Sequence, residues 1–309
     1  MDEEEKGMKK KSRGLLILLA VLVALLAVYA GLRAWNSEQD RKAEEEAEAE
    51  EIHVTDTDAS EIVSLKFNVG NGDIELVKEE GKWYCAKDKD FPLQQSYPED
   101  MSEAAGSMQA VRRLEDGDSL EDYGLEDPAY TIEYTDAAGN VTQILFGGMT
   151  EENYYVTVGD TGTVYTVAST VIDSFNYTLE DMAQLDDYPG IGSGNLLKEV
   201  ITQDGVTTTY DSEDEDQSED IASIAGGLGA VTLSEAADYS VEDQDLDGYG
   251  LDEDSRITVE VTYEQDGEEQ VMTLYIGAED GEGNRYVMLN DSRIVYLIST
   301  EVCDNILNI

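Results

Sequence analysis

Histidine and cysteine are scarce in this chain of 309 residues, which has one His and two Cys. The single histidine, His53, lies at the end of a charged segment, where a serine–histidine triad or a histidine metal site would have to be built by a linker. The glycine-rich stretches at residues 70–73 and 190–195 lack the lysine or the strand-to-helix context of a phosphate-binding loop. Carboxylates are so common that no acid and base pair stands out. The sequence therefore predicts that the protein is not an enzyme.

Basic residues are also scarce: 19 Lys and Arg face 70 Asp and Glu, which gives a net charge of -51. Such a chain repels nucleic acid phosphates, so DNA and RNA are not expected as partners. Six of the basic residues but only four of the acidic ones precede residue 34. The acidity therefore belongs to the part of the chain that folds.

The two cysteines, Cys85 and Cys303, lie far apart in the chain. In an exported protein they could form one disulfide or stay as two buried thiols, and the sequence leaves both alternatives open. Neither has a nearby pattern of basic residues that would favour a reactive thiolate. No cysteine directly follows the apolar N-terminal run, so a lipoprotein anchor is not expected.

One long apolar run is present, at residues 14–32, with 19 uncharged residues. This is about the length that crosses a hydrocarbon core of roughly 30 Å. The basic residues of segment 1–13 predict a cytoplasmic N-terminus. We therefore expect a single-pass cell-membrane protein that contacts the lipid bilayer through residues 14–32 and has its bulk outside the cell. A signal peptide cleaved before Gly31 is the alternative.

The glutamate-rich segment 33–59 has almost no apolar face. It is typical of a solvated stalk, which would hold the folded part away from the membrane and be repelled by anionic headgroups.

The rest of the chain repeats itself. YGLEDP at residues 123–128 matches YGLDED at residues 249–254. An alternating strand, a glycine turn and a returning strand follow each copy, and the returning strands end in ILFGG (144–148) and LYIGA (274–278). A further strand pair and a short helical pattern then close each copy, at residues 169–175 and 299–306. The offset between the copies grows in hairpin turns, where insertions are tolerated.

The segments upstream of these motifs correspond more loosely. Strand patterns at residues 61–86 have a shorter version at residues 196–210. Each is followed by a helix signal, with Ser96 capping a helical pattern that runs to residue 114 and Ser218 capping the second helix. The sequence thus predicts two tandem, diverged α+β domains, each a mostly antiparallel sheet with a middle helix and a terminal helix. The predicted bounds are 60–182 for the first repeat, 183–195 for the linker and 196–309 for the second.

Four motifs together resemble the domain-of-unknown-function family 4340: GKWY at residues 81–84, YGLEDP, ILFGG, and the hairpin from YYV to VYTV. The likeness covers residues 62–179 and continues as a degenerate second copy. The second copy has Asp254 where the first has Pro128, and it lacks GKWY. The resemblance implies an envelope protein with one N-terminal membrane segment, of a kind often associated with ABC-type export systems or with auxiliary components of gliding-type transporters. It implies no enzymatic activity.

The segment DQDLDGYGLDED, at residues 243–254, resembles a calcium-binding loop. Asp243, Asp245, Asp247 and Asp254 occupy positions one, three, five and twelve of an EF-hand loop, with glycine at position six. The twelfth residue is aspartate instead of glutamate, and the following segment alternates like a strand where an EF-hand needs a helix. A solvated acidic turn before the YGL repeat is therefore favoured. No cofactor is expected, and calcium is the one that this segment could bind.

Three hypotheses follow. The leading one is a membrane-anchored, externally facing, non-catalytic interaction or accessory protein of an envelope complex, with subunits of an ABC-type exporter as its expected partners. The alternative is an extracellular module that binds calcium or a cationic ligand through the acidic loop 243–254. A surface hydrolase that uses carboxylates ranks last, because nothing in the chain assembles its site.

Overall fold

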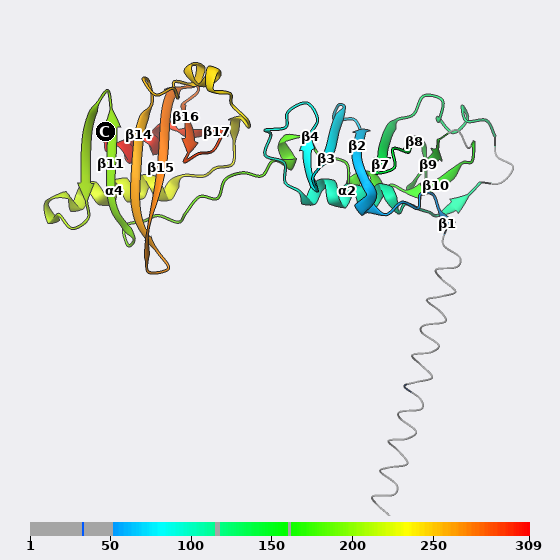
Figure 1. The fold of residues 1–309 in the computed structure, drawn as a ribbon, viewed down its shortest axis with the longest axis horizontal. Helices are drawn as coiled ribbons and strands as arrows, with labels where there is room; N and C mark the ends of the chain where they lie inside the picture. The colour runs from blue at the N-terminus through cyan, green and yellow to red at the C-terminus, as the bar shows by residue number, and fades with distance from the viewer. Residues whose placement is uncertain (1–32, 34–51, 115–117, 160–161) are drawn as a thin grey trace, which may run out of the picture.

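A computed structural model describes residues 33, 52–114, 118–159 and 162–309. The expected membrane segment 14–32, segment 1–13 and most of the stalk lie outside these residues. Figure 1 shows the described chain as two lobes side by side, joined by one extended segment. None of the helices within the described ranges is both long and apolar enough to span a membrane.

The first lobe is built on an antiparallel sheet of eight strands in the order β4-β3-β2-β7-β8-β9-β10-β6. The helix α2 (Ser96–Gly106) follows β4, and the short α3 (Thr170–Asp173) follows β10. A separate two-stranded sheet pairs β1 (Ile52–His53) with β5 (Gln109–Ala110). The eight strands are β2 (Ile62–Asn68), β3 (Ile74–Glu79), β4 (Lys82–Cys85), β6 (Arg112–Arg113), β7 (Tyr130–Asp136), β8 (Val141–Thr150), β9 (Asn153–Val158) and β10 (Tyr165–Ala168).

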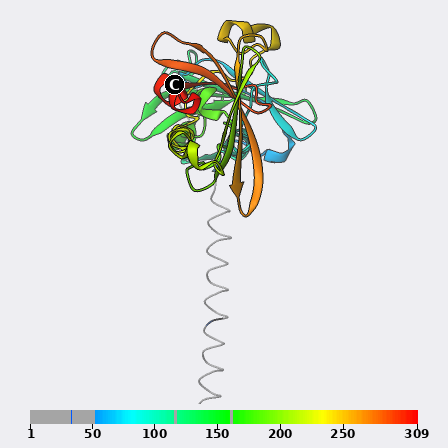
Figure 2. The same cartoon turned by 90° about the vertical axis from the view of Figure 1, so that its left-hand side faces the viewer.

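The second lobe is built on an antiparallel sheet of seven strands in the order β12-β11-β14-β15-β16-β17-β13. The helices α4 (Ser218–Ala230) and α5 (Thr300–Leu307) pack against each other on one side of this sheet, as Figure 2 shows. The seven strands are β11 (Leu196–Gln203), β12 (Val206–Asp211), β13 (Ala236–Asp238), β14 (Ile257–Gln265), β15 (Glu268–Glu279), β16 (Asn284–Leu289) and β17 (Val295–Ser299).

The two sheets correspond strand by strand. The order β3-β2-β7-β8-β9-β10-β6 of the first lobe repeats as β12-β11-β14-β15-β16-β17-β13 in the second. The strand β4, which begins at Lys82 of GKWY, has no counterpart among the described strands of the second lobe, so β12 is the outermost strand of its sheet. The chain therefore has the expected α+β class, with mostly antiparallel sheets and two copies of one domain.

Each domain has its own core. One cluster of buried residues runs from Ile62 to Met182, and a second runs from Ile191 to Leu307. Cys85 is buried in the first and Cys303 in the second, and both are free thiols. The disulfide alternative is therefore not realised in this structure.

The two middle helices begin one residue away from the predicted caps. Ser96 and Ser218 are the first helical residues, and Gln95 and Gln217 precede them without capping the helix. Each glutamine side chain instead accepts a backbone N–H from a sheet edge: Gln95 Oε1 from Trp83 at 2.7 Å, and Gln217 Oε1 from β12 at 2.8 Å. The glutamines thus tie helix to sheet.

The helix α2 ends at Gly106, well short of the predicted end at residue 114. The residues that follow pair with strands instead, because the backbone N–H groups of Val111 and Leu114 donate to carbonyl oxygens of Thr166 and Val164 at 2.8 and 2.9 Å. The terminal helix α5 begins as predicted, with Ser299 Oγ accepting the N–H of Val302 at 3.3 Å.

The segment after β13 contacts the first domain. The rings of Phe91 and Tyr239 lie 5.4 Å apart between centroids, and the hydroxyl of Ser240 donates to the carboxylate of Asp88. In addition, Asp186 of the linker accepts a hydrogen bond of 2.8 Å from the hydroxyl of Tyr296. These contacts fasten the linker and the first domain to the second.

Two neighbouring glycines in α4 provide a test of the helix packing. A Cβ on Gly227 would lie 2.7 Å from the backbone nitrogen of Ile306 in α5, whereas a Cβ on Gly226 would meet nothing within 4 Å. We expect Gly227→Ala to lower the free energy of unfolding by about 1–3 kcal/mol, because it overpacks the α4–α5 contact. Gly226→Ala, the matched control, should be neutral or stabilising by up to about 1 kcal/mol. Urea unfolding of both variants would show the difference, and equal effects would contradict this packing.

Candidate functional site

The YGL motif of the first domain is a tight turn that packs on a strand. Gly124 has a φ of +71°, which favours glycine, and Leu125 is buried. The carbonyl oxygen of Tyr123 accepts the N–H of Gly148 at 2.8 Å, and a Cβ on Gly147 would lie 2.1 Å from the same oxygen. Gly147, the first glycine at the end of ILFGG, is therefore required for the turn to reach the strand.

The second domain repeats this contact. Gly250 has a φ of +64°, Leu251 is fully buried, and a Cβ on Gly277 would lie 2.3 Å from the carbonyl oxygen of Tyr249. A hydrogen bond inside the turn also recurs. In both copies the N–H of the YGL leucine donates a hydrogen bond of 2.9 Å to the carbonyl oxygen five residues earlier, from Leu125 to Leu120 and from Leu251 to Leu246. The letters shared by the two copies are thus explained by packing.

The predicted calcium loop forms part of this repeated turn. Its first seven residues are the 3-10 helix η4 (Asp243–Tyr249), and the segment that follows enters the strand β14, as its alternation predicted. Asp245, Asp247 and Asp254 are exposed. Asp243 forms an ion pair of 2.6 Å with Arg293, and the side chain of Asp243 is 88% exposed. Within the described ranges, no three His, Cys, Asp or Glu side chains gather where they could hold a metal ion.

A depression of about 460 Å³ lies beside this turn. Arg256, which stacks on the ring of Tyr275 at 4.0 Å from its centroid, lines it together with Asp243 and Arg293. Two guanidinium groups and the carboxylate of Asp243 therefore line one depression, and Arg293 is the one that pairs with Asp243. The turn is held from below by Tyr249, whose hydroxyl donates to Asp238 at 3.1 Å; burial and the charge of Asp238 raise the pKa of this tyrosine.

The few residues with catalytic potential lie apart. His53 is in β1, where its Cα partner is Gln109 of β5. Burial raises the pKa of the Cys303 thiol to about 11, so it stays protonated at neutral pH and is a poor nucleophile. The structure brings none of these groups next to the acidic loop.

A buried carboxylate was missed by sequence reasoning. Glu199 of β11 is fully buried, and neither of its oxygens has a hydrogen-bond partner. It pairs with Val261 as Leu65 of the first domain pairs with Tyr134, so it stands at a core position. Burial raises its pKa to about 8. The hydroxyl of Tyr188 is also buried without a partner, and burial and the nearby Glu199 charge raise the pKa of that tyrosine.

Tandem α+β domains, whose shared residues maintain the fold, define the class of this protein. The chain belongs to the family described as Domain of unknown function (DUF4340), whose sequence profile matches residues 83–186 and again residues 209–307. The resemblance expected from the sequence is thereby confirmed, including its occurrence in both copies. Comparison with curated proteins and with solved structures finds no significant match.

Glu199 makes the stability of the second domain depend on pH. Its pKa of about 8 in the folded state exceeds the ordinary value of 4.5, so the folded protein binds the extra proton between these values. The stability from this protonation is complete below about pH 4.5 and is lost as pH rises through about 8, at about 1.4 kcal/mol per pKa unit. The first domain has Leu65 at the position of Glu199. We therefore expect Glu199→Leu to stabilise the protein more at pH 8 than at pH 5.

The measurement is urea unfolding of the second domain at both pH values. Glu199→Gln is the control, because it keeps the shape of the side chain without titrating. The general charge repulsion of the chain is nearly the same in all three proteins. A wild-type pH dependence equal to that of Glu199→Gln would contradict the assignment.

Proposed function

We propose that this protein is a membrane-anchored, externally facing, non-catalytic interaction or accessory protein of an envelope complex, with subunits of an ABC-type exporter as the expected partners. The anchor is the apolar run at residues 14–32, and the exporter association comes from the family resemblance of the sequence. In this proposal the two domains serve as a scaffold outside the membrane.

One observation carries the proposal. The residues that both copies share, from Tyr123 to Leu125 and from Tyr249 to Leu251, are used to pack a turn on a strand, so the duplication repeats a scaffold. The copies also differ at a sheet edge, where β12 lacks the covering strand that β4 provides in the first domain, and exposed segments of this kind recognise binding partners. A protein that doubles its framework and opens an edge in one copy fits an interaction role.

Crosslinking on intact cells tests this role. Lys66, Lys82, Lys87 and Lys89 are exposed on the first domain. We expect a membrane-impermeant, amine-reactive crosslinker to join the chain to a polytopic membrane protein without cell lysis. A cytosolic protein of similar lysine content is the control. Labelling that requires lysis would contradict the external location, and labelling without a crosslinked partner would contradict the accessory role.

The alternative is a calcium-binding or cation-binding module at residues 243–254. Its support is the exposure of Asp243, Asp245 and Asp247 within one short element. Because Asp243 already pairs with Arg293 and the turn repeats that of the first domain, the interaction proposal is the better supported of the two.

Thermal melting separates the two proposals. With millimolar calcium, compared with magnesium, we expect the same melting temperature shift in the wild type and in the Asp245→Asn, Asp247→Asn variant. A rise of several degrees that is specific to calcium and absent from the variant would instead establish the metal site.

A further inference from the structure

The second domain differs from the first at one edge of its sheet. In the first domain, β3 is covered by β4, whereas β12, the counterpart of β3, pairs only with β11 among the strands of the described ranges. Residues Val206 to Thr209 are exposed, and Val206 is 67% exposed. A sheet edge of this kind offers unpaired backbone groups to another chain.

The hairpin geometry shows which backbone groups are offered. The turn between β11 and β12 has two residues, Asp204 and Gly205, both with positive φ, and it is closed by the pair Gln203 and Val206. Because hydrogen-bonded and non-hydrogen-bonded pairs alternate in an antiparallel ladder, the N–H and C=O groups of Thr207 and Thr209 point away from β11. An added strand would pair with these two residues.

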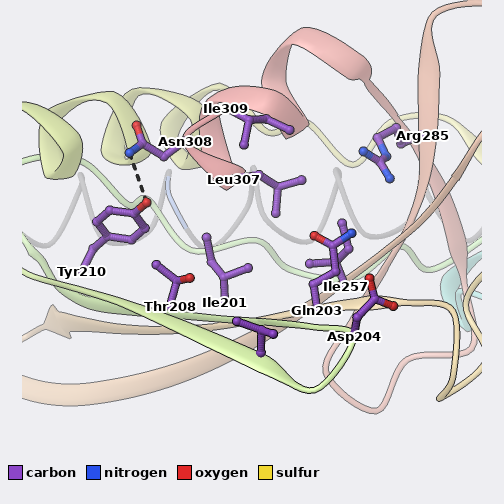
Figure 3. Close-up of a pocket in the computed structure, with 11 residues that line it drawn as sticks. Ile201, Gln203, Asp204, Thr208, Tyr210, Ile257, Arg285, Leu307, Asn308 and Ile309 are labelled. Atoms are coloured by element: carbon purple, nitrogen blue, oxygen red, sulfur yellow. Dashed lines mark hydrogen bonds between the residues drawn. The ribbon is translucent and has the colours of Figure 1, made fainter.

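A pocket of about 510 Å³ lies directly behind this edge. Figure 3 shows it between the hairpin and the C-terminal end of the chain, with Thr208 and Tyr210 on one side and Leu307 and Ile309 on the other. The hydroxyl of Tyr210 accepts a hydrogen bond of 3.3 Å from the Asn308 amide, which fixes the end of the chain over the pocket. The side chains at alternate positions of β12 therefore line a cavity.

The pocket exists where aromatic residues of the first domain are replaced. In the first domain, the rings of Tyr130 and Tyr154 stand edge to face, with centroids 5.6 Å apart, and pack as partly buried residues against the core. Strand register places smaller or polar residues at the same positions in the second domain. Ile201, Ile257 and Arg285 stand where the first domain has Phe67, Tyr130 and Tyr154.

Arg285 favours an aromatic occupant. Its Nε and Nη2 donate to the carbonyl oxygen of Gly277 at 3.1 and 2.9 Å, which holds the guanidinium plane at the wall of the pocket. A fixed guanidinium plane stacks well on an aromatic ring. Five of the other ten lining residues are aliphatic: Ile201, Val206, Ile257, Leu307 and Ile309. The pocket therefore suits a ring of the kind that the first domain places there itself.

The charge around this edge selects a basic partner. Residues 196–309 contain 29 acidic and four basic side chains. The strand β12 begins just after Asp204 and ends at Asp211, and Glu213 and Asp214 follow. Opposite charge in a partner would speed its association and orient it on the strand.

We propose that β12 and the pocket behind it bind an extended segment of a partner protein, which adds a strand to the sheet, places one aromatic side chain in the pocket and carries basic residues beside it. This inference rests on the proposed interaction function and assigns it a surface. The chain itself contains a strand of this composition at the matching edge of the first sheet, since β4 combines Lys82 with Trp83.

A short peptide provides the probe. The hexapeptide KWYSAK copies residues 82–87 with serine in place of Cys85, has blocked ends and carries a fluorescent label. We expect saturable binding to the full-length chain in detergent, measured by fluorescence anisotropy. The same peptide with alanine in place of both aromatic residues should bind at least tenfold more weakly. A higher salt concentration should weaken the binding of both peptides, because it screens the attraction between opposite charges.

Two variants locate the binding surface. Thr209→Pro removes an outward N–H without breaking the ladder to β11, and we expect it to weaken binding at least tenfold, whereas Thr209→Ala should change binding less than twofold. Ile201→Phe restores the aromatic residue of the first domain and should fill the pocket, again with at least tenfold weaker binding. Circular dichroism melting of each variant checks that the domain remains folded.

Three results would overturn the inference. The first is no saturable binding to the wild type, and the second is equal binding by Thr209→Pro and Thr209→Ala. The third is self-association that Thr209→Pro abolishes, which would make a second copy of the chain the occupant.

The proposed function is judged separately, by placing a photo-crosslinking residue at position 207 in cells, with position 141 as the exposed control. A partner captured from other surfaces but never from position 207 would leave the interaction role standing and reject this binding surface.

Discussion

The contact between the YGL turn and a glycine strand is the constraint on which each domain depends. In both copies the turn carbonyl lies so close to the strand that a Cβ would collide with it, and the β-bulge of the central strands falls at the same place, between Phe146 and Met149 and between Ile276 and Glu279. A bulge bends a strand and increases its twist. The turn and the bulge thus set the direction of β9 and β16 together, and with it the arrangement of the strands that follow.

Within that framework, the two cores have diverged in opposite directions. The first contains the buried rings of Phe67, Phe146 and Phe175 and is sealed by β4 with its buried Trp83. The second contains no phenylalanine or tryptophan in its buried cluster, and it has an open pocket and the buried carboxyl group of Glu199. Burial of a carboxyl group without a hydrogen bond is costly, and an uncovered edge strand invites association. The buried carboxyl group lowers the stability of the second domain, and the uncovered strand exposes its backbone groups to other chains. They are easier to understand if this domain makes the contacts and the first domain supplies rigidity.

Much of this architecture could be predicted from the sequence. The repeated YGL, the glycine-ended strands and the missing GKWY in the second copy already indicate the duplication, because each is a short motif with a steric cause. The positions of Glu199 and of the end of α2 could not. The bulge between Leu196 and Lys198 shifts the alternation of β11 and turns Glu199 into the core, and strand pairing to β10 ends the helical pattern after Gly106. Long-range pairing decides both, and local propensity cannot report it.

The negative charge of the chain affects which partners can pair with the edge of the second sheet. A uniformly acidic surface keeps copies of a protein apart, which matters for a domain with an uncovered strand, since β12 would otherwise offer its backbone to the β12 of another copy. Asp204 and Asp211 stand at the two ends of that strand, so self-pairing would bring like charges together, whereas a basic segment would relieve the same repulsion. The negative charge therefore acts against pairing with a second copy of the chain and favours pairing with a basic segment of another protein. An interaction surface that is both open and selective requires this combination.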